Sequence, residues 1–414
     1  MSEDHHVWII NHYSTIPSKD HSHGRHLGLA QYLSEYGWYP VLFVASTTHP
    51  LGEQRMGTLA CTKRTMELGV PCVWIRTPAY WGKQMLRLFN MIAFTVGLLR
   101  PGATRGVPRP SVVLGSTVHP LAAWAASRLA KRYRIPFVYE IRDIWPESLV
   151  DLGALSARGL PAKLLARLSD TLIKKADRVV SPLPNIGLYL SDRHFPDKLS
   201  SYIPNGIDAP SNWEREDHTT PKRGSFTFMY LGSHGYGNGL ETLLSAFDKA
   251  SQQTSTVKAS LRLIGDGPRK KKLMDFAKTL SSSESITFED RIPRSQVMGR
   301  AQEADCLVAS LANMPVLRYG ISPNKFFDYM LAARPIICAA PSGLSPIEEA
   351  GAGLTVEPGD ESGLCQAMTE MLAAGDEKRI QMGLQGRDYV LKHFTYHDLA
   401  ARLAGILKSL VVEQ

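Results

Sequence analysis

The stretch YGISPNKFFDYMLAARPIICAA, residues 319–340, predicts a short helix that leads directly into a buried strand. Ser322 is a suitable helix N-cap, and Pro323 stands at the first helical position, where proline is tolerated. The apolar run at residues 336–340 is of the kind that a parallel sheet buries on both faces. Such a helix–strand unit is typical of α/β proteins.

The same alternation of strands and helices continues along the chain and restarts after a polar, proline-bearing segment at residues 205–225. At 414 residues the chain is also too long for one small core. We therefore predict an α/β protein with two doubly wound, Rossmann-like domains, residues 1–203 and 204–395, that face each other across a cleft. The expected strands are residues 7–11, 39–46, 111–116, 136–143, 177–182, 200–208, 226–232, 261–267, 286–291, 305–311 and 335–340.

The net charge of +8 is unevenly distributed. Residues 1–203 contain 24 Lys and Arg against 14 Asp and Glu, whereas residues 204–414 contain 23 against 25. The basic residues are scattered and form no aromatic-interleaved platform, so we expect no nucleic acid partner. An anionic membrane surface or a phosphate-bearing ligand fits the basic first half better.

The sequence indicates a reducing compartment. Its five cysteines show no paired metal spacing, and Cys306 and Cys338 lie in apolar strand-like runs, which favours buried free thiols. The N-terminus leads straight into a strand, so we expect no signal peptide. We expect a cytoplasmic protein.

The longest apolar run, residues 88–99, lies between Arg87 and Arg100. It is too short to span a bilayer, which needs roughly 20 apolar residues. Two interpretations remain open and carry equal weight. The run is either a core helix or an interfacial helix that rests on a membrane between its basic flanks.

A glycine-rich segment, GSHGYGNG at residues 232–239, stands between an expected strand and helix. Glycine allows the backbone to approach an anion closely, and the following helix N-terminus favours negative charge. The spacing is not the dinucleotide fingerprint, and a merely tight turn is the alternative. Residues 269–272, RKKK, are expected to form a solvated helix face rather than a site.

Lys325 presents an electrostatic puzzle, because a cation in the first turn of a helix opposes the helix dipole. A diphosphate bound at this helix N-terminus would remove the conflict. Asp328, three residues later on the same face, is then placed to accept the hydroxyls of a ribose. A simple surface pair between Lys325 and Asp328 is the alternative.

In the first domain, Arg142 and Asp143 follow an expected strand and are candidates for charge stabilisation or acid–base chemistry. A structural ion pair is equally consistent with them. Gly24 and Arg25 resemble an acceptor-phosphate loop. A metal site at His21, His23 and His26 is disfavoured, because no carboxylate or thiolate accompanies them.

Four motifs in order, RDIWPES (142–148), YIPNGID (202–208), LRLIGDGP (261–268) and SPNKFFDYMLAARPII (322–337), resemble family 4 of the retaining glycosyltransferases. RDIWPES is similar to the RDLWPES signature of the bacterial surface-polysaccharide branch, which transfers amino sugars such as N-acetyl-fucosamine. The resemblance implies the GT-B fold, a nucleotide-sugar donor, no cofactor and no metal. It also implies that the final helix, residues 396–414, crosses back to the first domain.

The chain departs from the family pattern at several positions. The first of two family glutamates falls at Gly320 and the second at Asp328, and the family's basic pair is replaced by Ser233 and Asn238. Lys325, together with Arg318, must then carry more of the diphosphate charge. Arg142 replaces the usual histidine, as in the RDLWPES branch.

From the residues and the resemblance together we predict a retaining glycosyltransferase. It would move a sugar from a nucleoside-diphosphate donor, with uridine as the expected nucleoside, to a polyprenyl-diphosphate-linked saccharide in O-antigen or capsule assembly, at the inner face of the membrane. An epimerase of the same fold and a non-catalytic partner of another transferase are the alternatives. The predicted catalytic residues are Arg142, Asp143 and Lys325; the donor-binding residues are Gly232, Ser233, Gly237, Asn238, Gly265, Asp266, Arg291, Ile292, Gly320, Ile321, Ser322, Pro323, Asn324 and Asp328; the acceptor-binding residues are His23, Gly24, Arg25, His119, Trp145 and Glu147.

Overall fold

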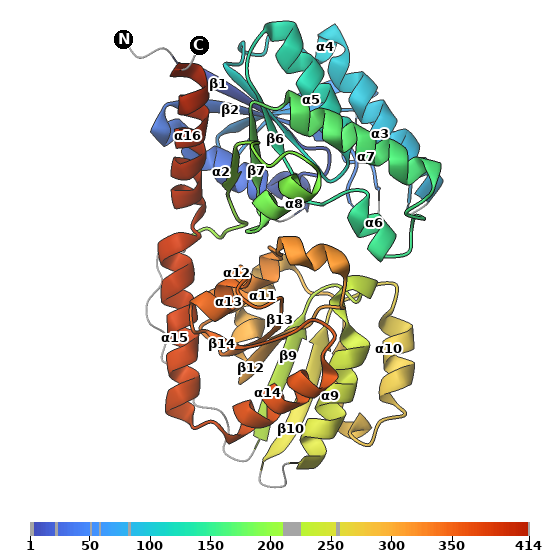
Figure 1. Cartoon of the computed structure of the whole chain (residues 1–414), viewed down its shortest axis with the longest axis vertical. Helices are drawn as coiled ribbons and strands as arrows, with labels where there is room; N and C mark the ends of the chain where they lie inside the picture. Colours follow the sequence, from blue (N-terminus) through green and yellow to red (C-terminus); the bar gives the residue numbers. More distant parts are fainter. Residues whose placement is uncertain are drawn as a thin grey trace. The chain divides into compact units, whose positions relative to one another are not determined.

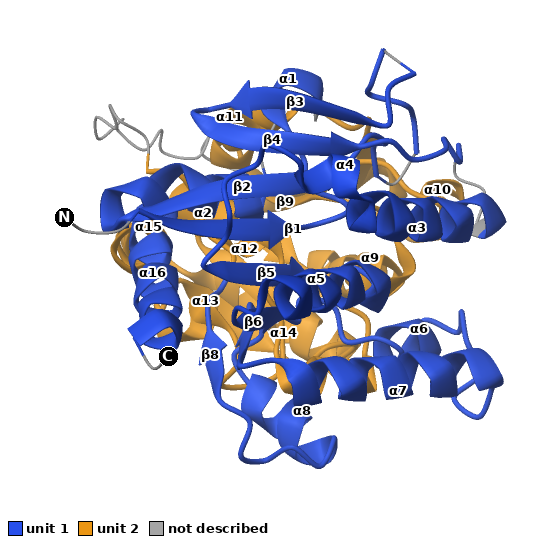
Figure 2. Ribbon diagram, turned by 90° about the horizontal axis from the view of Figure 1, so that it is seen from above, with its two compact units in different colours: residues 1–204, 396–414 blue, residues 205–395 orange. Residues whose placement is uncertain are grey.

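The computed structural model divides into two compact α/β units (Figures 1 and 2). Unit 1 comprises residues 1–204 and 396–414, and unit 2 comprises residues 205–395. In each unit, helices cover both faces of one sheet. The structure describes residues 4–20, 24–49, 52–57, 59–81, 84–209, 225–253 and 257–412.

The eight-stranded sheet of unit 1 has the order β3-β4-β2-β1-β5-β6-β7-β8. All neighbouring strands run parallel except β3 and β4. The order in which strands are added to the sheet reverses between β1 and β5. Open α/β sheets bind ligands beyond the carboxyl ends of the strands at such a switch point. The strands are His5–Ile10 (β1), Trp38–Ala45 (β2), Thr62–Glu67 (β3), Val70–Ile75 (β4), Val112–Ser116 (β5), Phe137–Glu140 (β6), Arg178–Ser181 (β7) and Ser200–Tyr202 (β8).

The hairpin β3–β4 corrects the expectation of parallel pairing throughout. Neither strand is among those expected from the sequence, and the two pair antiparallel from Thr62 with Ile75 to Glu67 with Val70. Leu68 and Gly69 form the turn with φ of 48° and 79°, and two residues with positive φ suit the twist of a tight hairpin. Leucine is an unusual residue at such a position, and β3 is largely polar, so neither the turn nor the strand has a sequence signal.

Two helical layers enclose the unit 1 sheet. Helices α2 and α16 bury their apolar sides against one face of the sheet. On the opposite face α3 contacts β4, α5 contacts β5 and α7 contacts β6. The unit 1 helices are Pro17–Asp20 (α1), Arg25–Leu33 (α2), Gln84–Leu99 (α3), Pro101–Thr104 (α4), Pro120–Tyr133 (α5), Glu147–Asp151 (α6), Leu160–Lys175 (α7), Ile186–Asp192 (α8) and Tyr396–Val412 (α16), with a 3₁₀ turn at Ser34–Tyr36.

The C-terminal helix α16 packs on α2 within unit 1. Leu399, Leu403 and Leu407 repeat every four residues and are at most 1% exposed, so one helix face is buried in the core. A Cβ added at Gly28 of α2 would lie 2.5 Å from the Tyr396 ring. The small residue therefore permits this close helix contact.

The six-stranded sheet of unit 2 is parallel throughout and has the order β11-β10-β9-β12-β13-β14. It confirms the strands expected there, including the one at residues 336–340, and adds the edge strand β14. The strands are Ser225–Leu231 (β9), Lys258–Ile264 (β10), Ile286–Glu289 (β11), Cys306–Ala309 (β12), Ile336–Ala339 (β13) and Gly353–Val356 (β14).

Unit 2 also has two helical layers (Figure 1). Helices α9, α10 and α14 pack on one face of the sheet, and α11, α12, α13 and α15 pack on the other. They are Leu240–Gln253 (α9), Lys270–Ala277 (α10), Arg294–Gln302 (α11), Asn324–Leu331 (α12), Pro346–Glu349 (α13), Glu361–Ala373 (α14) and Asp376–His393 (α15), with 3₁₀ turns at Tyr236–Asn238, Ser283–Ser285 and Pro315–Tyr319.

All five cysteines are free thiols, and the expected burial of Cys306 and Cys338 is confirmed. Burial raises the pKa of the Cys338 thiol to about 12, so it stays protonated. Cys61 is the exposed exception.

One side of helix α3 is that of a core helix, and the interfacial interpretation of the apolar run at residues 88–99 stays a prediction. Phe94 and Leu98 are fully buried, as a core helix requires. Phe89 and Ile92, however, are 59% and 43% exposed on another side of the helix. Within the described ranges, no helix is sufficiently long and apolar to cross a membrane.

Candidate functional site

The carboxyl edge of the unit 2 sheet carries the glycine-rich loop. Gly232 follows β9 and Gly239 precedes α9, so the expected strand, loop and helix occur in that order. The loop packs tightly on the next one, because a Cβ on Gly265 would lie 1.9 Å from the Gly232 carbonyl oxygen. The φ of +152° at Gly265 also favours glycine. Glycine thus brings two loops together beside the positive end of the α9 dipole.

Lys325, in the first turn of α12, reaches this loop. Its Nζ atom donates to the Tyr230 hydroxyl and to Asn238 Oδ1, both at 3.0 Å, and lies 4.4 Å from the centre of the Tyr230 ring. Among the described residues, no carboxylate lies within ion-pair distance of Nζ. Burial lowers the pKa of Lys325 to about 7, because neutral partners replace the lost hydration of an ammonium ion only in part. An anionic ligand would supply the missing counter-charge.

The start of α12 differs from the prediction. Pro323, rather than Ser322, is the capping residue, and no side chain caps the helix. Ser322 is instead held by Asn205 of the YIPNGID segment. The Asn205 backbone amide donates to Ser322 Oγ at 3.1 Å, and Asn205 Nδ2 donates to the Ser322 carbonyl at 2.5 Å. A tertiary contact has therefore replaced the local cap, and among the described residues no side chain caps the first turn of α12.

Asp328 does not pair with Lys325, so the surface-pair alternative is wrong. Asp328 is 5% exposed, and both of its carboxylate oxygens accept from the guanidinium of Arg294 at the start of α11. Arg294 was not predicted from the sequence. Each carboxylate oxygen retains further acceptor capacity, so ribose binding by Asp328 stays a prediction.

The remaining donor-site residues named from the sequence lie in loops at the same edge. The loops are tied to one another: Gly232 N donates to Ile264 O at 3.0 Å, and Gly265 N donates to Glu289 O at 3.2 Å. These residues are Ser233, Gly237 and Asn238 after β9, Asp266 after β10, exposed Arg291 and half-buried Ile292 after β11, and Gly320, Ile321 and Asn324 before and at the start of α12.

Two of the four basic residues at 269–272 are structural, which corrects the expectation of a solvated helix face. Lys270 Nζ donates to the carbonyls of Gly265 and Glu289, both at 3.0 Å, and to Asp290 Oδ1 at 2.7 Å. Arg269 pairs with Glu241. Lys270 therefore joins the loops after β10 and β11.

His234 is a second residue that was not predicted from the sequence. Its side chain is fully buried in the glycine-rich loop, and neither ring nitrogen has a partner among the described residues. Burial, with a smaller contribution from nearby Lys270, lowers the pKa of His234 to about 4. The ring is therefore neutral at pH 7.

In unit 1, Arg142 and Asp143 lie beyond the carboxyl end of β6. Thr117 Oγ1, from the loop after β5, accepts from the Arg142 backbone amide at 2.9 Å. Arg142 Nε has no partner among the described residues, and Asp143 is exposed. The structure shows no ion pair between these two described side chains, so they are not held together as a structural pair.

His119, a predicted acceptor residue, lies beside Thr117 but points into the interior. It is 1% exposed, and its Nε2 lies 2.6 Å from Nδ1 of His12. Burial, together with the positive charge of Arg87, lowers the pKa of His119 to about 3. The two histidines are therefore a neutral pair at the switch point between β1 and β5.

The structure corrects the prediction that the Arg25 side chain binds an acceptor phosphate. The side chain is 1% exposed and its Nε donates to Glu140 Oε1 at 2.8 Å, while Nη1 donates to the Pro204 carbonyl. His26 completes this network through Glu140 Oε2 at 2.5 Å. Burial acts to raise the pKa of Glu140, but the charges of His26 and Arg25 outweigh it and hold the pKa well below its usual range. The Arg25 charge is already neutralised.

The other predicted acceptor-site residues lie in different environments. Gly24 immediately precedes α2, where a Cβ would lie 2.6 Å from Thr15 Oγ1. Trp145 is half-buried. Glu147 pairs with Arg193 at 3.3 Å, and burial raises the pKa of Glu147. His23 lies outside the described residues.

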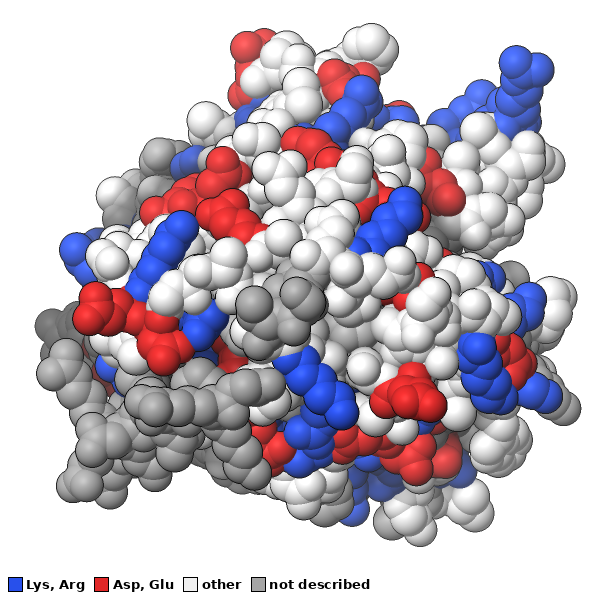
Figure 3. Space-filling model, turned by 90° about the horizontal axis from the view of Figure 1, so that it is seen from below, with Lys and Arg blue, Asp and Glu red and all other residues white. Residues whose placement is uncertain are grey.

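No group of metal-binding side chains is present in the part of the chain that the structure describes. His26 is instead engaged with Glu140 and with Asn11 Nδ2 at 2.5 Å. On the face drawn in Figure 3, acidic and basic side chains are interspersed and form no large patch of one sign.

The chain matches two family models that correspond to its two halves. Residues 25–206 match the glycosyl transferase 4-like domain, and residues 225–374 match glycosyl transferases group 1. Among curated proteins, it is 27% identical over 311 residues to the probable glycosyltransferase WbjE of Pseudomonas aeruginosa, covering 69% of this chain and 71% of that one. It is also 27% identical over 177 residues to a GDP-mannose-dependent phosphatidylinositol monomannoside mannosyltransferase of Mycobacterium tuberculosis, covering 41% and 44%.

Solved structures share the fold along the whole chain. Sucrose-phosphate synthase of Thermosynechococcus elongatus has a TM-score of 0.74 at 16% identity and covers 99% of this chain and 100% of that one. Anabaena HepE in complex with UDP and glucose has a TM-score of 0.65 at 14% identity, covering 98% and 99%. The chain therefore belongs to the glycosyltransferases of the two-domain GT-B fold.

Proposed function

We propose that the protein transfers a sugar, with retention of anomeric configuration, from a nucleoside diphosphate to a lipid-linked saccharide. Uridine is the nucleoside we favour, because HepE has been solved with UDP-glucose and an Escherichia coli trehalose-6-phosphate protein with UDP-2-fluoro glucose, both with the same fold. The resemblance of RDIWPES to the surface-polysaccharide signature supports a role in O-antigen or capsule assembly and an amino sugar as the transferred group.

Lys325 is the observation that carries the donor assignment. A partly desolvated ammonium ion with neutral partners lies between the first turn of α12 and the glycine-rich loop. A nucleoside diphosphate leaves with increasing negative charge, and preorganised cations and amides stabilise such charge without reorganising. Lys325 and the loop therefore suit a leaving diphosphate better than a neutral ligand.

The proposed reaction follows from the need to stabilise the negative charge on the leaving diphosphate. We assign no side-chain nucleophile and propose same-face attack by the acceptor hydroxyl, with the departing phosphate taking its proton. Arg142 and Asp143 are the unit 1 residues we assign to charge stabilisation or acid–base work. Neither a cofactor nor a metal ion is part of this proposal.

We place the protein at the inner face of the cytoplasmic membrane. The basic charge of the first half and the exposed side chains of α3, such as Phe89 and Ile92, support peripheral attachment to an anionic bilayer. Phe94 belongs to the core instead, so replacing Phe89 and Ile92 by Ser should release the protein from liposomes, whereas Phe94→Ser should unfold unit 1.

A donor screen tests the function. Purified protein is incubated with UDP-, GDP- and dTDP-sugars and bacterial lipid extract, and nucleoside diphosphate release and the anomeric configuration of the product are measured. Release that requires lipid supports the proposal. Conversion of one donor sugar into another without acceptor indicates the epimerase, and activity only with a second protein indicates the non-catalytic partner. Absence of release with every donor overturns the proposal.

A further inference from the structure

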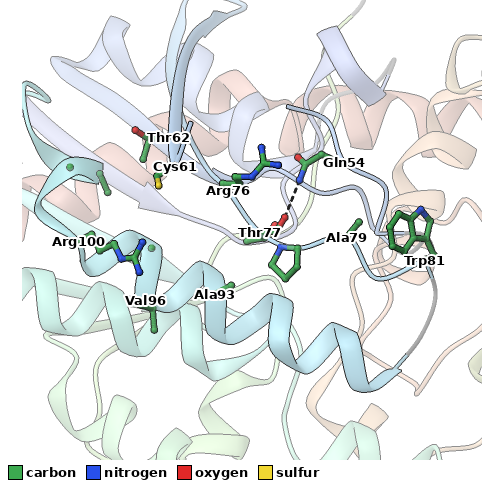
Figure 4. Close-up of a pocket in the computed structure, with 14 residues that line it drawn as sticks. Gln54, Cys61, Thr62, Arg76, Thr77, Ala79, Trp81, Ala93, Val96 and Arg100 are labelled. Carbon is green, nitrogen blue, oxygen red and sulfur yellow. Dashed lines mark hydrogen bonds between the residues drawn. The ribbon is translucent and has the colours of Figure 1, made fainter. Parts of the chain in front are cut away.

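Unit 1 contains a groove of about 710 Å³ beside α3, between that helix and the segments around β3 and β4 (Figure 4). Its lining is mostly apolar, and Gln54 Nε2 donates to the Thr77 carbonyl there at 3.0 Å. Among the described residues, no buried side-chain atom of the lining lacks a hydrogen-bond partner. The groove therefore contains no buried polar group that a ligand would have to satisfy, in contrast to the surroundings of Lys325 in unit 2.

The ammonium group of Lys325 carries three N–H donors, and the protein accepts two of them. The acceptors are the Tyr230 hydroxyl oxygen and Asn238 Oδ1, both at 3.0 Å. Among the described residues, Nζ has no third acceptor within hydrogen-bond distance. The ammonium ion therefore keeps one N–H for an oxygen atom from outside the protein, and a half-buried donor favours such a partner.

A shared backbone carbonyl orients both acceptors of Lys325. The Tyr230 hydroxyl donates its only proton to the Ser233 carbonyl at 2.8 Å, and Asn238 Nδ2 donates to the same oxygen at 2.8 Å. Because both donors are committed, the Tyr230 oxygen and Asn238 Oδ1 act as acceptors toward Lys325. The hydrogen bonds form a closed ring from Lys325 through Tyr230, Ser233 and Asn238.

The backbone of β9 supports this ring at two points. A Cβ on Gly232 would lie 3.0 Å from the Tyr230 hydroxyl and 3.4 Å from Lys325 Nζ, so a glycine there leaves room for the lysine to reach the loop. Tyr329, one turn after Lys325 on α12, accepts from the Leu231 amide at 2.7 Å and donates to the Leu231 carbonyl at 3.0 Å. The helix is therefore fastened to β9 by a contact that does not involve Lys325.

We propose that Tyr230 and Asn238 are positioning residues for the donor: they hold two N–H groups of Lys325 at the glycine-rich loop and leave the third to a phosphate oxygen of the nucleoside diphosphate. This inference rests on the proposed function, which supplies the diphosphate. Asn238, predicted from the sequence to bind the donor directly, then acts through Lys325.

The groups that surround Lys325 do not titrate near neutral pH. Burial raises the pKa of Tyr230 on β9 well above its usual range and that of the Cys338 thiol on β13 to about 12. Burial lowers the pKa of His234 in the glycine-rich loop to about 4. All three side chains are therefore uncharged between pH 6.5 and 8.5, and a change of charge in this range can be assigned to Lys325, whose pKa is lowered to about 7 by burial.

The pKa of Lys325 in the ligand-free protein is the direct readout of positioning. It is measured by NMR titration of lysines labelled with ¹³C at Cε, and Lys325→Arg assigns the signal. Tyr230→Phe should lower this pKa, because the ammonium ion loses an acceptor. Asn238→Asp should raise it, because a carboxylate supplies a counter-charge. A loosened structure would raise the pKa in both variants, toward the ordinary lysine value of about 10.4.

Calorimetry with UDP tests whether the two residues act through Lys325. At pH 7, Tyr230→Phe should weaken UDP binding about fivefold, because it removes one hydrogen bond that holds the ammonium ion. In the Lys325→Met background the same substitution should have almost no effect, since a residue that acts through Lys325 has nothing left to position. Binding of uridine should be unchanged in every variant.

Tyr329→Phe is the matched control. It also removes a buried tyrosine hydroxyl beside β9, but that hydroxyl contacts Leu231 rather than Lys325. The melting temperature should fall, whereas the pKa of Lys325 should stay the same. If Tyr230→Phe does not fold, Asn238→Asp at a half-buried loop position carries the test, with a raised pKa and weaker UDP binding as its expected results.

Two results overturn the proposal. One is a Lys325 pKa that neither Tyr230→Phe nor Asn238→Asp changes. The other is an equal loss of UDP affinity from Tyr230→Phe in the parent and in the Lys325→Met background. Failure of the proposed function is a separate result: no nucleoside diphosphate would bind the parent, and the phosphate half of the proposal would fall. Opposite pKa shifts in the two variants would still show that Tyr230 and Asn238 hold Lys325.

Discussion

Lys325 in unit 2 and Arg25 in unit 1 are two cations at the beginning of helices, and the sequence predicts phosphate binding for both. Arg25 is paired with Glu140, 115 residues away in the chain, and its side chain is 1% exposed. Among the described residues, Lys325 has only the Tyr230 hydroxyl and the Asn238 amide oxygen as hydrogen-bond partners. A cation at a helix start is therefore available to a ligand only when the fold leaves its charge uncompensated.

The energetic reason is desolvation. A phosphate that bound Arg25 would have to replace the Glu140 carboxylate, which already offsets the cost of burying the guanidinium. At Lys325 that cost is not offset, as its lowered pKa shows. Binding a diphosphate there adds the attraction that the fold lacks.

The largest expected effect concerns Arg25, whose charge is compensated by Glu140. Glu140→Gln should lower the free energy of unfolding of unit 1 by about 3–5 kcal/mol, because it leaves the Arg25 charge buried without a partner. Lys325→Met should not lower the stability of unit 2, since it removes a cation that is costly to bury. Urea unfolding, with proteolysis to assign the transitions, measures both changes.

Glu147→Gln is the matched control for this experiment. Glu147 forms an ion pair with Arg193, and their side chains are 27% and 21% exposed. The loss in the free energy of unfolding should therefore stay below about 1 kcal/mol. Equal losses for Glu140→Gln and Glu147→Gln would show that burial does not separate the two pairs.

The second prediction tests the uncompensated cation. Lys325→Ala should weaken nucleoside diphosphate binding tenfold or more, because a charged hydrogen bond contributes about 1.5–3 kcal/mol. Binding of the free nucleoside should change far less. Calorimetry measures both affinities, and Lys272→Ala on the exposed side of α10 is the control. Equal diphosphate affinities for Lys325→Ala and the parent would remove Lys325 from the site.

The third prediction uses the pKa of Lys325. Because that pKa is lowered to about 7, the side chain is mostly ammonium below pH 7 and mostly neutral above it. Diphosphate affinity should therefore be highest near pH 6.5 and fall as the pH rises to 8.5, and the protein should take up a proton on binding at pH 8. Calorimetry in buffers of different ionisation enthalpy counts that proton.

Lys325→Arg sharpens this result, since arginine stays charged throughout the range. Its diphosphate affinity should be nearly independent of pH between 6.5 and 8.5. A parent protein with the same flat profile would show that Lys325 is already protonated across this range.

The smallest expected effect concerns Asp328. Asp328→Asn should weaken binding of the whole nucleotide several-fold through the ribose, whereas Asp328→Glu should be tolerated, since the family pattern carries a glutamate there. Arg294→Ala serves as the comparison, because it frees both carboxylate oxygens while keeping the carboxylate. If Asp328→Asn leaves the affinity for the UDP donor unchanged, Asp328 is only the partner of Arg294.

The sequence alone was sufficient for the elements with a local signal. The apolar runs of β9, β12 and β13 and the glycine-rich loop before α9 could be recognised from neighbouring residues, because strand burial and turn conformation depend on short stretches of chain. The first turn of α12 was located to within one residue. Lys325 was singled out because its charge opposes the dipole of its own helix.

Only the tertiary structure decided which charges and hydrogen-bond groups meet. Glu140 neutralises Arg25, and Arg294 donates to the Asp328 carboxylate. The Asn205 backbone amide donates to the Ser322 hydroxyl, which would otherwise cap α12. The antiparallel hairpin β3–β4 and the groove beside α3 were likewise decided only by the tertiary structure. These partners are distant in the chain, and whether a buried charge is compensated depends on where folding brings its counter-ion, which residue type and local spacing do not encode.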